Sequence, residues 1–164
     1  MKALVTYYSQ TGNTEKIARA IYETIYFEKE ILAIRDVKNL QGYDIIFAGF
    51  PVQAHSVPAA FLPFFKKLPA GQDIALFCTH GSLRGGQLPK QAIEHAIGLA
   101  SGARILGTFS VRGEVNPKVL DSLMNSPQNH VWAEEALGAC GHPDEADLAD
   151  AKEFTKSVLA KLGG

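Results

Sequence analysis

The chain has 164 residues, of which 46% are hydrophobic and 20% are charged, and its formal net charge is −1. This length suits one domain, and the composition is that of a globular protein rather than a disordered or fibrous one. The charge is uneven, because residues 121–164 hold 3 Lys and Arg against 8 Asp and Glu. The other cations are scattered and form no dense basic stripe. We therefore expect a single domain over residues 1–164 that does not bind nucleic acid.

Two further features concern the cellular compartment. No apolar run is long enough to cross a bilayer, and the first residues have the pattern of a β-strand and not of a signal peptide. Cys78 and Cys140 are the two cysteines, too few for a disulfide framework, so we expect both to be reduced. These observations predict a cytoplasmic protein without a membrane segment.

Short apolar segments typical of β-strands alternate along the chain with segments of helical periodicity. The predicted strands are residues 3–8, 30–34, 43–50, 74–78 and 105–111. The predicted helices begin at a cap on Thr14, near Phe61 with a late start or a bend at Pro63, near Ile93, and at Asp144. The segment 43–50 is almost continuously apolar, which is typical of a strand buried on both faces of a parallel sheet.

This alternation predicts an α/β fold with a doubly wound, five-stranded parallel sheet, because each parallel connection lays a helix on a sheet face. Ligands of such sheets bind beyond the carboxyl ends of the strands. The stretch 112–143 is too long for a plain connection, and we expect a short helix near 117–124 within it.

The most informative segment is the loop 9–14 (Ser-Gln-Thr-Gly-Asn-Thr), between the first predicted strand and helix. Hydroxyls of Ser9, Thr11 and Thr14, backbone N–H groups and a helix N-terminus can converge there on phosphate oxygens, and Gly12 permits close approach. The loop has no Lys or Arg, unlike the loops that hold nucleoside triphosphates. It therefore indicates a site for one terminal phosphate. The alternative interpretation is an ordinary turn rich in capping residues.

Residues 7–14 (Tyr-Tyr-Ser-Gln-Thr-Gly-Asn-Thr) resemble the FMN phosphate loop of flavodoxins, and the element order agrees along the whole chain. The resemblance implies a flavodoxin-like fold with strand order 2-1-3-4-5 and FMN as cofactor. It also implies that loops 51–56 and 79–86 hold the flavin ring. The FMN-binding residues expected on this basis are Ser9, Gln10, Thr11, Gly12, Asn13, Thr14, Pro51, Val52, Gln53, Ala54, His55, Thr79, His80, Gly81, Arg84 and Gly85.

The sequence departs from this family in one respect. Many flavodoxins stack Trp or Tyr on the flavin ring, and neither ring loop here contains either residue. The available substitutes are Val52, Gln53, His55, His80 and Leu83. His55 and His80 could donate a hydrogen bond or proton to the ring, or be ordinary solvent-exposed or backbone-bonded loop histidines. Arg84 could stabilise the reduced ring or meet an acidic partner, or be surface charge. Fewer aromatics favour a more accessible flavin.

Two Cys-x-His pairs, Cys78 with His80 and Cys140 with His142, could together supply four zinc ligands. Their spacing is unusual, and Cys78 completes an apolar strand where a buried thiol is ordinary. We therefore predict no metal site. Trp132 is either a peripheral core contact or a cover for the flavin or a partner surface.

The resemblance implies an electron carrier that exchanges electrons with partner proteins through FMN. One alternative is a small FMN-dependent reductase that takes electrons from NAD(P)H or a partner flavoprotein and acts on an organic substrate. Another is an interaction module that keeps the fold without flavin. The sequence does not predict the oligomeric state.

Overall fold

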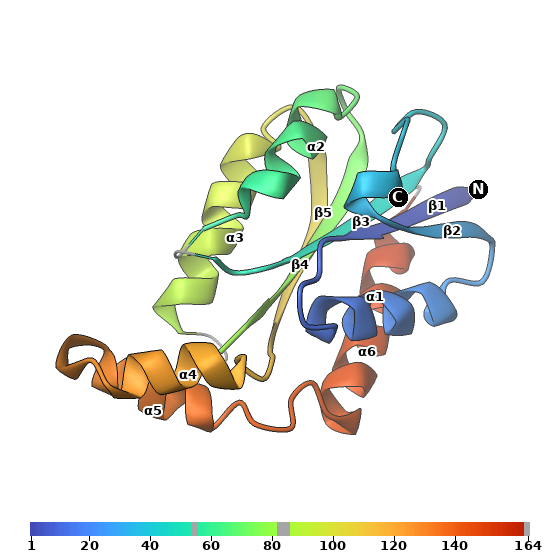
Figure 1. Cartoon of the computed structure of the whole chain (residues 1–164). Helices are drawn as coiled ribbons and strands as arrows, with labels where there is room; N and C mark the ends of the chain where they lie inside the picture. Colours follow the sequence, from blue (N-terminus) through green and yellow to red (C-terminus); the bar gives the residue numbers. More distant parts are fainter. Residues whose placement is uncertain (54–55, 82–85, 163–164) are drawn as a thin grey trace.

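A computed structural model describes residues 1–53, 56–81 and 86–162 (Figure 1). Five parallel strands form one sheet in the order β2-β1-β3-β4-β5. The strands are β1 (Lys2–Tyr7), β2 (Glu28–Ala33), β3 (Ile45–Pro51), β4 (Asp73–His80) and β5 (Arg104–Arg112). The predicted fold class, strand number and strand order are confirmed. The fourth strand runs two residues beyond its predicted end at Cys78, so Thr79 and His80 belong to the sheet and not to a loop.

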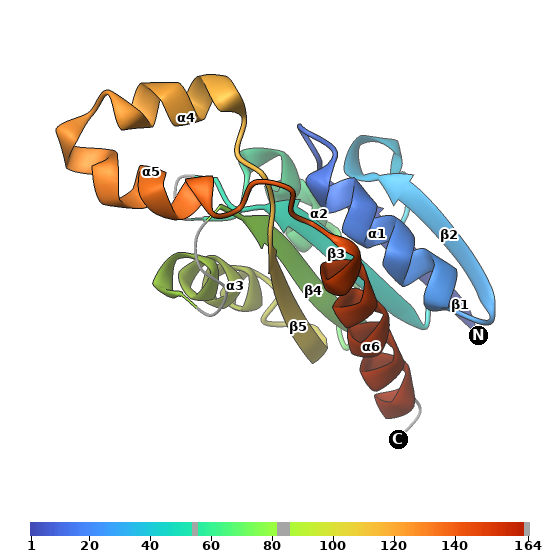
Figure 2. The ribbon, with the colours of Figure 1, turned by 90° about the horizontal axis from the view of Figure 1, so that it is seen from below.

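Helices cover both faces of the sheet (Figures 1 and 2). On one face lie α1 (Asn13–Thr24) and α6 (Glu145–Lys161), and on the other lie α2 (Leu62–Lys67) and α3 (Gln87–Leu99). Side chains of β1 alternate between the two cores, with Val5 and Tyr7 on the α1 face and Leu4 on the other. Burial on both faces explains why the central strands β3 and β4 are almost continuously apolar.

Each core contains a group of phenylalanine rings. On the α6 side, Phe154 contacts Phe47 and Phe109, with ring centroids 6.3 and 5.3 Å away. On the other side, Phe61 packs against Phe64 with a centroid separation of 5.0 Å. The helix α2 that carries Phe64 follows a 3₁₀ turn (Ala59–Phe61) and has Pro63 in its first turn, where the missing N–H is tolerated. The predicted late start of this helix is confirmed.

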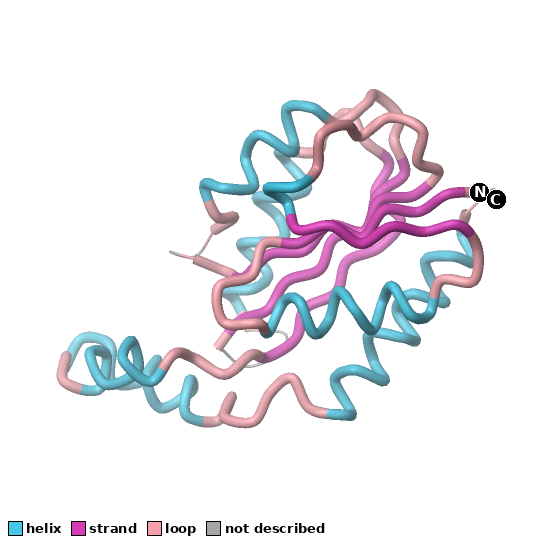
Figure 3. The backbone as a smooth tube through the Cα atoms, turned by 45° about the vertical axis from the view of Figure 1, so that its right-hand side comes forward, coloured by secondary structure: helices cyan, strands magenta, loops and turns pink. Residues whose placement is uncertain are grey.

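Two further helices lie outside these layers, beyond the carboxyl end of β5 (Figures 2 and 3). They are α4 (Pro117–Met124) and α5 (His130–Leu137), joined by a 3₁₀ turn (Pro127–Asn129), and we call residues 117–137 the helical hairpin. The predicted helix at 117–124 is confirmed, whereas α5 was not predicted. Over the described ranges, no helix combines the length and apolarity required to span a membrane.

Candidate functional site

Three predicted loops start side by side at the carboxyl edge of the sheet. The backbone N–H of Tyr8 donates to the carbonyl of Gly49 at 3.0 Å, which joins the ends of β1 and β3. The N–H of Val52 donates to the carbonyl of Thr79 at 2.9 Å, which joins the ends of β3 and β4. The loops after β1, β3 and β4 therefore share one edge, as the sequence predicted from the strand order.

The first loop turns sharply into α1 at Gly12. This residue has φ 91°, a left-handed conformation that favours glycine, and it is the N-cap of α1. Its N–H donates to Ser9 Oγ at 3.0 Å, so the loop folds back on its own first hydroxyl. No atom lies within 4 Å of the position that a Cβ of Gly12 would occupy. The backbone at Gly12 is thus open to an incoming group.

Thr14 does not cap α1 as the sequence predicted, because Gly12 occupies the N-cap and Thr14 lies in the first helical turn. Its side chain is buried, and its Oγ1 lies 2.8 Å from Thr79 Oγ1. One hydroxyl donates in this pair, and the other keeps an O–H free to donate to a further acceptor. The pair places a buried donor beside the N-terminus of α1.

Together these groups form a site for an anion that needs no basic side chain. The N–H groups of the first helical turn have no intrahelical acceptor, and the helix dipole makes this end partly positive. The hydroxyls of Ser9 and Thr14 lie beside these N–H groups in sequence, and the exposed Thr11 lies between them. Such a donor set suits one phosphate group. The residues present therefore fit the phosphate of FMN.

Two amides of this loop have other partners. Asn13 Nδ2 donates to the carbonyl of Glu114 at 2.9 Å, and Gln10 Nε2 donates to the hydroxyl of Tyr8 at 3.1 Å. Gly113 makes room for Asn13, because a Cβ at Gly113 would lie 2.8 Å from Asn13 Nδ2. The side chain of Asn13 therefore joins the phosphate loop to the segment before the helical hairpin. No local pattern predicts this contact, since its partners are 101 residues apart.

The second loop is a narrow turn after Pro51, the last residue of β3. Gln53 and Ser56 exchange backbone hydrogen bonds of 3.0 and 2.9 Å, as an isolated antiparallel bridge. Ser56 Oγ is also hydrogen-bonded to Nδ1 of His95 in α3. The predicted residues Ala54 and His55 lie outside the described residues. The base of this loop is therefore fixed to α3.

The third loop begins at Gly81, directly after His80. His80 is 6% exposed at the end of β4, so its interpretation as a solvent-exposed loop histidine is wrong. A Cβ at Gly81 would lie 2.5 Å from Val115 Cγ2 and 3.7 Å from the Cβ of Ala136. The helical hairpin and the segment before it therefore pack directly on the start of this loop. The predicted residues Arg84 and Gly85 fall outside the described ranges, as does Leu83.

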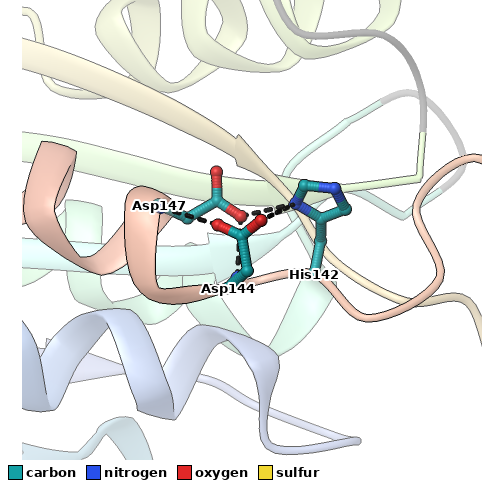
Figure 4. Close-up of side chains that lie close together, drawn as sticks. All are labelled: His142, Asp144 and Asp147. Atoms are coloured by element: carbon teal, nitrogen blue, oxygen red, sulfur yellow. Dashed lines mark hydrogen bonds and ion pairs between the residues drawn. The ribbon is translucent and has the colours of Figure 1, made fainter.

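The postulated four-ligand zinc set gains no support from the described residues. Cys78 is fully buried in the core, and burial raises the pKa of its thiol to about 12. In the described part of the chain, the cluster with metal-ligand geometry is His142, Asp144 and Asp147, which contains neither cysteine (Figure 4).

This cluster is explained by the start of α6. Asp144 is the N-cap, and it forms a capping box with Asp147, in which each carboxylate accepts the other residue's N–H at 2.9 Å. Asp147 Oδ2 also lies 2.6 Å from His142 Nδ1, while Asp144 Oδ2 lies 3.8 Å from it. The hydrogen bond from the N–H of Asp147 contributes most to holding the pKa of Asp144 below its usual value. The three side chains thus lie at the N-terminus of α6, where Asp144 and Asp147 cap the helix.

The comparison with known families gives one match over nearly the whole chain. A family model described as a flavodoxin domain matches residues 4–156. The flavodoxin-like domain-containing protein BilS of Clostridioides difficile (strain CD3) is 30% identical over 173 residues, which cover 98% of this chain and 98% of that protein.

Solved structures share the fold at low identity. A flavodoxin from the domain Archaea has a TM-score of 0.67 and 19% identity, with all of both chains covered. A flavoprotein from Lactobacillus acidophilus NCFM, solved in complex with FMN, has a TM-score of 0.54 and 20% identity, covering 66% of this chain and 92% of that one. The azoreductase AzrA has a TM-score of 0.59 and 15% identity, covering 94% and 99%. A flavodoxin and an azoreductase are thus both similar to this chain in fold.

Proposed function

Because this chain belongs to the flavodoxin domain family, we propose that it binds FMN and exchanges electrons with partner proteins. The phosphate would lie on residues 9–14, and the ring between the loops that follow β3 and β4. The observation that carries this assignment is the cation-free donor set of the first loop, with the open backbone at Gly12 and the buried hydroxyl pair of Thr14 and Thr79. When bound, FMN supplies one- and two-electron transfer.

The protein's own residues would set how the cofactor is held. The first turn of α1 and the hydroxyls bind and orient the phosphate, because their donors are fixed before the ligand arrives. The second loop contributes backbone groups held in place by the Gln53 and Ser56 bridge. The third loop starts at Gly81, which is packed against Val115 and Ala136, so the first residue of this loop is held in place.

A second candidate is an FMN-dependent reductase with its own organic substrate. It is supported by the likeness in fold to the azoreductase AzrA, and by the absence of Trp and Tyr from residues 51–56 and 79–86. A ring without aromatic cover has more room for a substrate or a nicotinamide against its face.

The visible spectrum of the purified protein tests the cofactor assignment. We expect flavin absorption bands and one FMN per chain after reconstitution, and a colourless protein that does not take up added FMN would establish the flavin-free alternative. Oxidation of NAD(P)H by the holoprotein with a quinone acceptor separates the two redox functions. Inertness without a partner reductase supports the carrier, whereas sustained turnover supports the reductase.

The proposal includes a place of action. We propose that the protein works in the cytoplasm with reductase or acceptor proteins as partners. This is supported by Cys78 and Cys140, which are both free thiols, one buried and one exposed. Affinity capture from a cell lysate with the FMN-loaded protein should retain a redox enzyme, and the apoprotein should retain less of it.

A further inference from the structure

A cavity of about 440 Å³ lies beside the start of the phosphate loop, at Tyr8 and Ser9. It is formed between the carboxyl ends of β1 and β2, the 3₁₀ turn η1 (Ile34–Asp36) and the helix α2. Its volume is within the range of small-molecule sites. Its lining includes Tyr8 and Ser9, which lead into the phosphate loop. Of the residues that the structure describes in 52–59 and 79–86, none lines the cavity. The proposed FMN site does not account for it.

Part of the cavity wall is made of apolar and aromatic side chains. Leu40 and Phe64 are buried in its wall, and Val37 and Tyr8 are half-buried beside them. Tyr7 is 9% exposed, and its hydroxyl donates to Glu15 Oε1 at 2.7 Å. Burial and this hydrogen bond raise the pKa of Tyr7, so it lines the cavity as a neutral phenol. These walls suit an aromatic or aliphatic body.

The charges around the cavity favour an anion. Three cations line it, Arg35, Lys38 and Lys67, against one carboxylate, that of Glu15. The Glu15 carboxylate already accepts from Tyr7 and lies 3.6 Å from Nε of Arg19, which reduces its effect on a ligand.

The cations themselves are weakly paired. Arg35 has Asp36 at 4.0 Å, with 87% of its side chain exposed. Among the residues that the structure describes, Lys38 and Lys67 form no ion pair. Aromatic and apolar wall residues beside weakly paired cations suit an amphipathic anion.

We propose that this cavity binds a small aromatic carboxylate, with its ring system against Tyr8 and Phe64 and its carboxylate at Arg35 and Lys67. Such a ligand would be held beside the phosphate loop, in a site that shares Ser9 with the proposed FMN site but none of its other described residues. The proposal does not depend on FMN binding, because the cavity residues other than Tyr8 and Ser9 lie outside the phosphate and ring loops. It assigns a second ligand class to the protein, whichever redox function applies.

Titration of the isotope-labelled full chain with naphthoate, followed by nuclear magnetic resonance, tests this proposal. We expect saturable shifts of backbone signals in residues 7–9, 33–40 and 60–67. Naphthamide, which has the same rings and no charge, should bind about tenfold more weakly, as expected for the loss of one charged hydrogen bond. Both titrations are run with and without FMN.

The double substitution Arg35→Gln and Lys67→Gln should weaken naphthoate binding by about tenfold or more. Lys66→Gln is the matched control, since Lys66 neighbours Lys67 on α2 but does not line the cavity. All three side chains are exposed, so the variants should keep the unfolding midpoint of the parent protein.

Three outcomes would overturn the proposal. The first is naphthoate binding without shifts in the cavity residues, and the second is equal affinity of naphthoate and naphthamide. The third is a parallel loss of FMN affinity in the Arg35→Gln and Lys67→Gln variant, which would make these cations part of the flavin site. A protein that fails to bind FMN but binds naphthoate as expected refutes the proposed function and leaves this site standing.

Discussion

The phosphate side and the ring side of the candidate site are built in different ways. On the phosphate side, Ser9 and Gly12 form a loop from neighbouring residues, and the helix that follows provides further donors. On the ring side, the start of the third loop at Gly81 is shaped by Val115 and Ala136, which come from a distant segment. Neighbouring residues therefore provide most of the first half, to which Thr79 adds one distant hydroxyl, whereas packing of distant residues shapes the second. The two halves should respond differently to substitution.

The largest expected effect is on the phosphate side. The double substitution Thr11→Ala and Thr14→Ala should lower FMN affinity by about 10²- to 10⁴-fold, because each hydrogen bond to a charged group contributes about 1.5–3 kcal/mol. Fluorescence quenching of added FMN measures this affinity. Thr24→Ala is the control, since Thr24 Oγ1 donates to the carbonyl of Ala20 at the far end of α1. An unchanged affinity of the double variant would show that the loop does not bind the phosphate.

On the ring side, Gly81→Ala should reduce stability. Its new methyl group would lie 2.5 Å from Val115 Cγ2, and valine has little rotamer freedom with which to move away. Overpacking of this kind lowers the free energy of unfolding by about 1–3 kcal/mol, as urea denaturation would measure.

A second substitution, Val115→Ala, should restore part of the stability lost in Gly81→Ala, which a double-mutant cycle detects. Gly98→Ala is the control for the method, because no atom lies within 4 Å of its Cβ position in α3. That control should gain about 0.5–1 kcal/mol from helix propensity. A neutral Gly81→Ala would show that Val115 does not confine the start of this loop.

Asn13→Ala tests the connection between the two sides. It removes the hydrogen bond to the carbonyl of Glu114, which should lower the free energy of unfolding by about 0.5–1.5 kcal/mol. Hydrogen exchange in the helical hairpin should become faster, because the segment that leads into it at Glu114 is no longer held to the phosphate loop. Gln10→Ala, which loses only a hydrogen bond to Tyr8 at the surface, should leave this exchange unchanged. Equal exchange in both variants would contradict the connection.

The smallest effect concerns Cys140, which follows the end of the helical hairpin at Leu137. Its Sγ donates to Glu114 Oε1 at 3.4 Å, and this hydrogen bond and the carboxylate charge raise the pKa of the thiol. Since only the thiolate is alkylated, Glu114→Gln should lower that pKa and speed alkylation several-fold near neutral pH. Mass spectrometry of the iodoacetamide product measures the rate. Cys78, which is fully buried, should stay unmodified in the folded protein and serves as the internal control.

The features predicted from sequence are those that local physics determines. The apolar segment 43–50 predicted a buried strand, and the hydroxyls of residues 9–14 predicted an anion site. In both cases the residues that carry the signal are neighbours in the sequence. The helix at 117–124 was predicted from the length of the stretch around it. Strand order came with the family resemblance and could not have come from periodicity alone.

The features that sequence did not predict join residues far apart. The bond between Thr14 and Thr79 spans 65 residues, and the bond between Asn13 and Glu114 spans 101. Helix α5 was missed because it packs on α4 and not on the sheet, and its pattern of apolar residues does not match a sheet-facing helix. Burial of His80 follows from the length of β4, which depends on pairing with β5.

The hydroxyl pair of Thr14 and Thr79 has a consequence for how the protein matures. The two residues meet only after β1, β3 and β4 have paired, so the phosphate site does not exist in the unfolded chain. A ligand that binds only the native state shifts the folding equilibrium, by about 1.4 kcal/mol for each tenfold excess over its dissociation constant. The supply of flavin in the cell would therefore affect the lifetime of this protein against proteolysis.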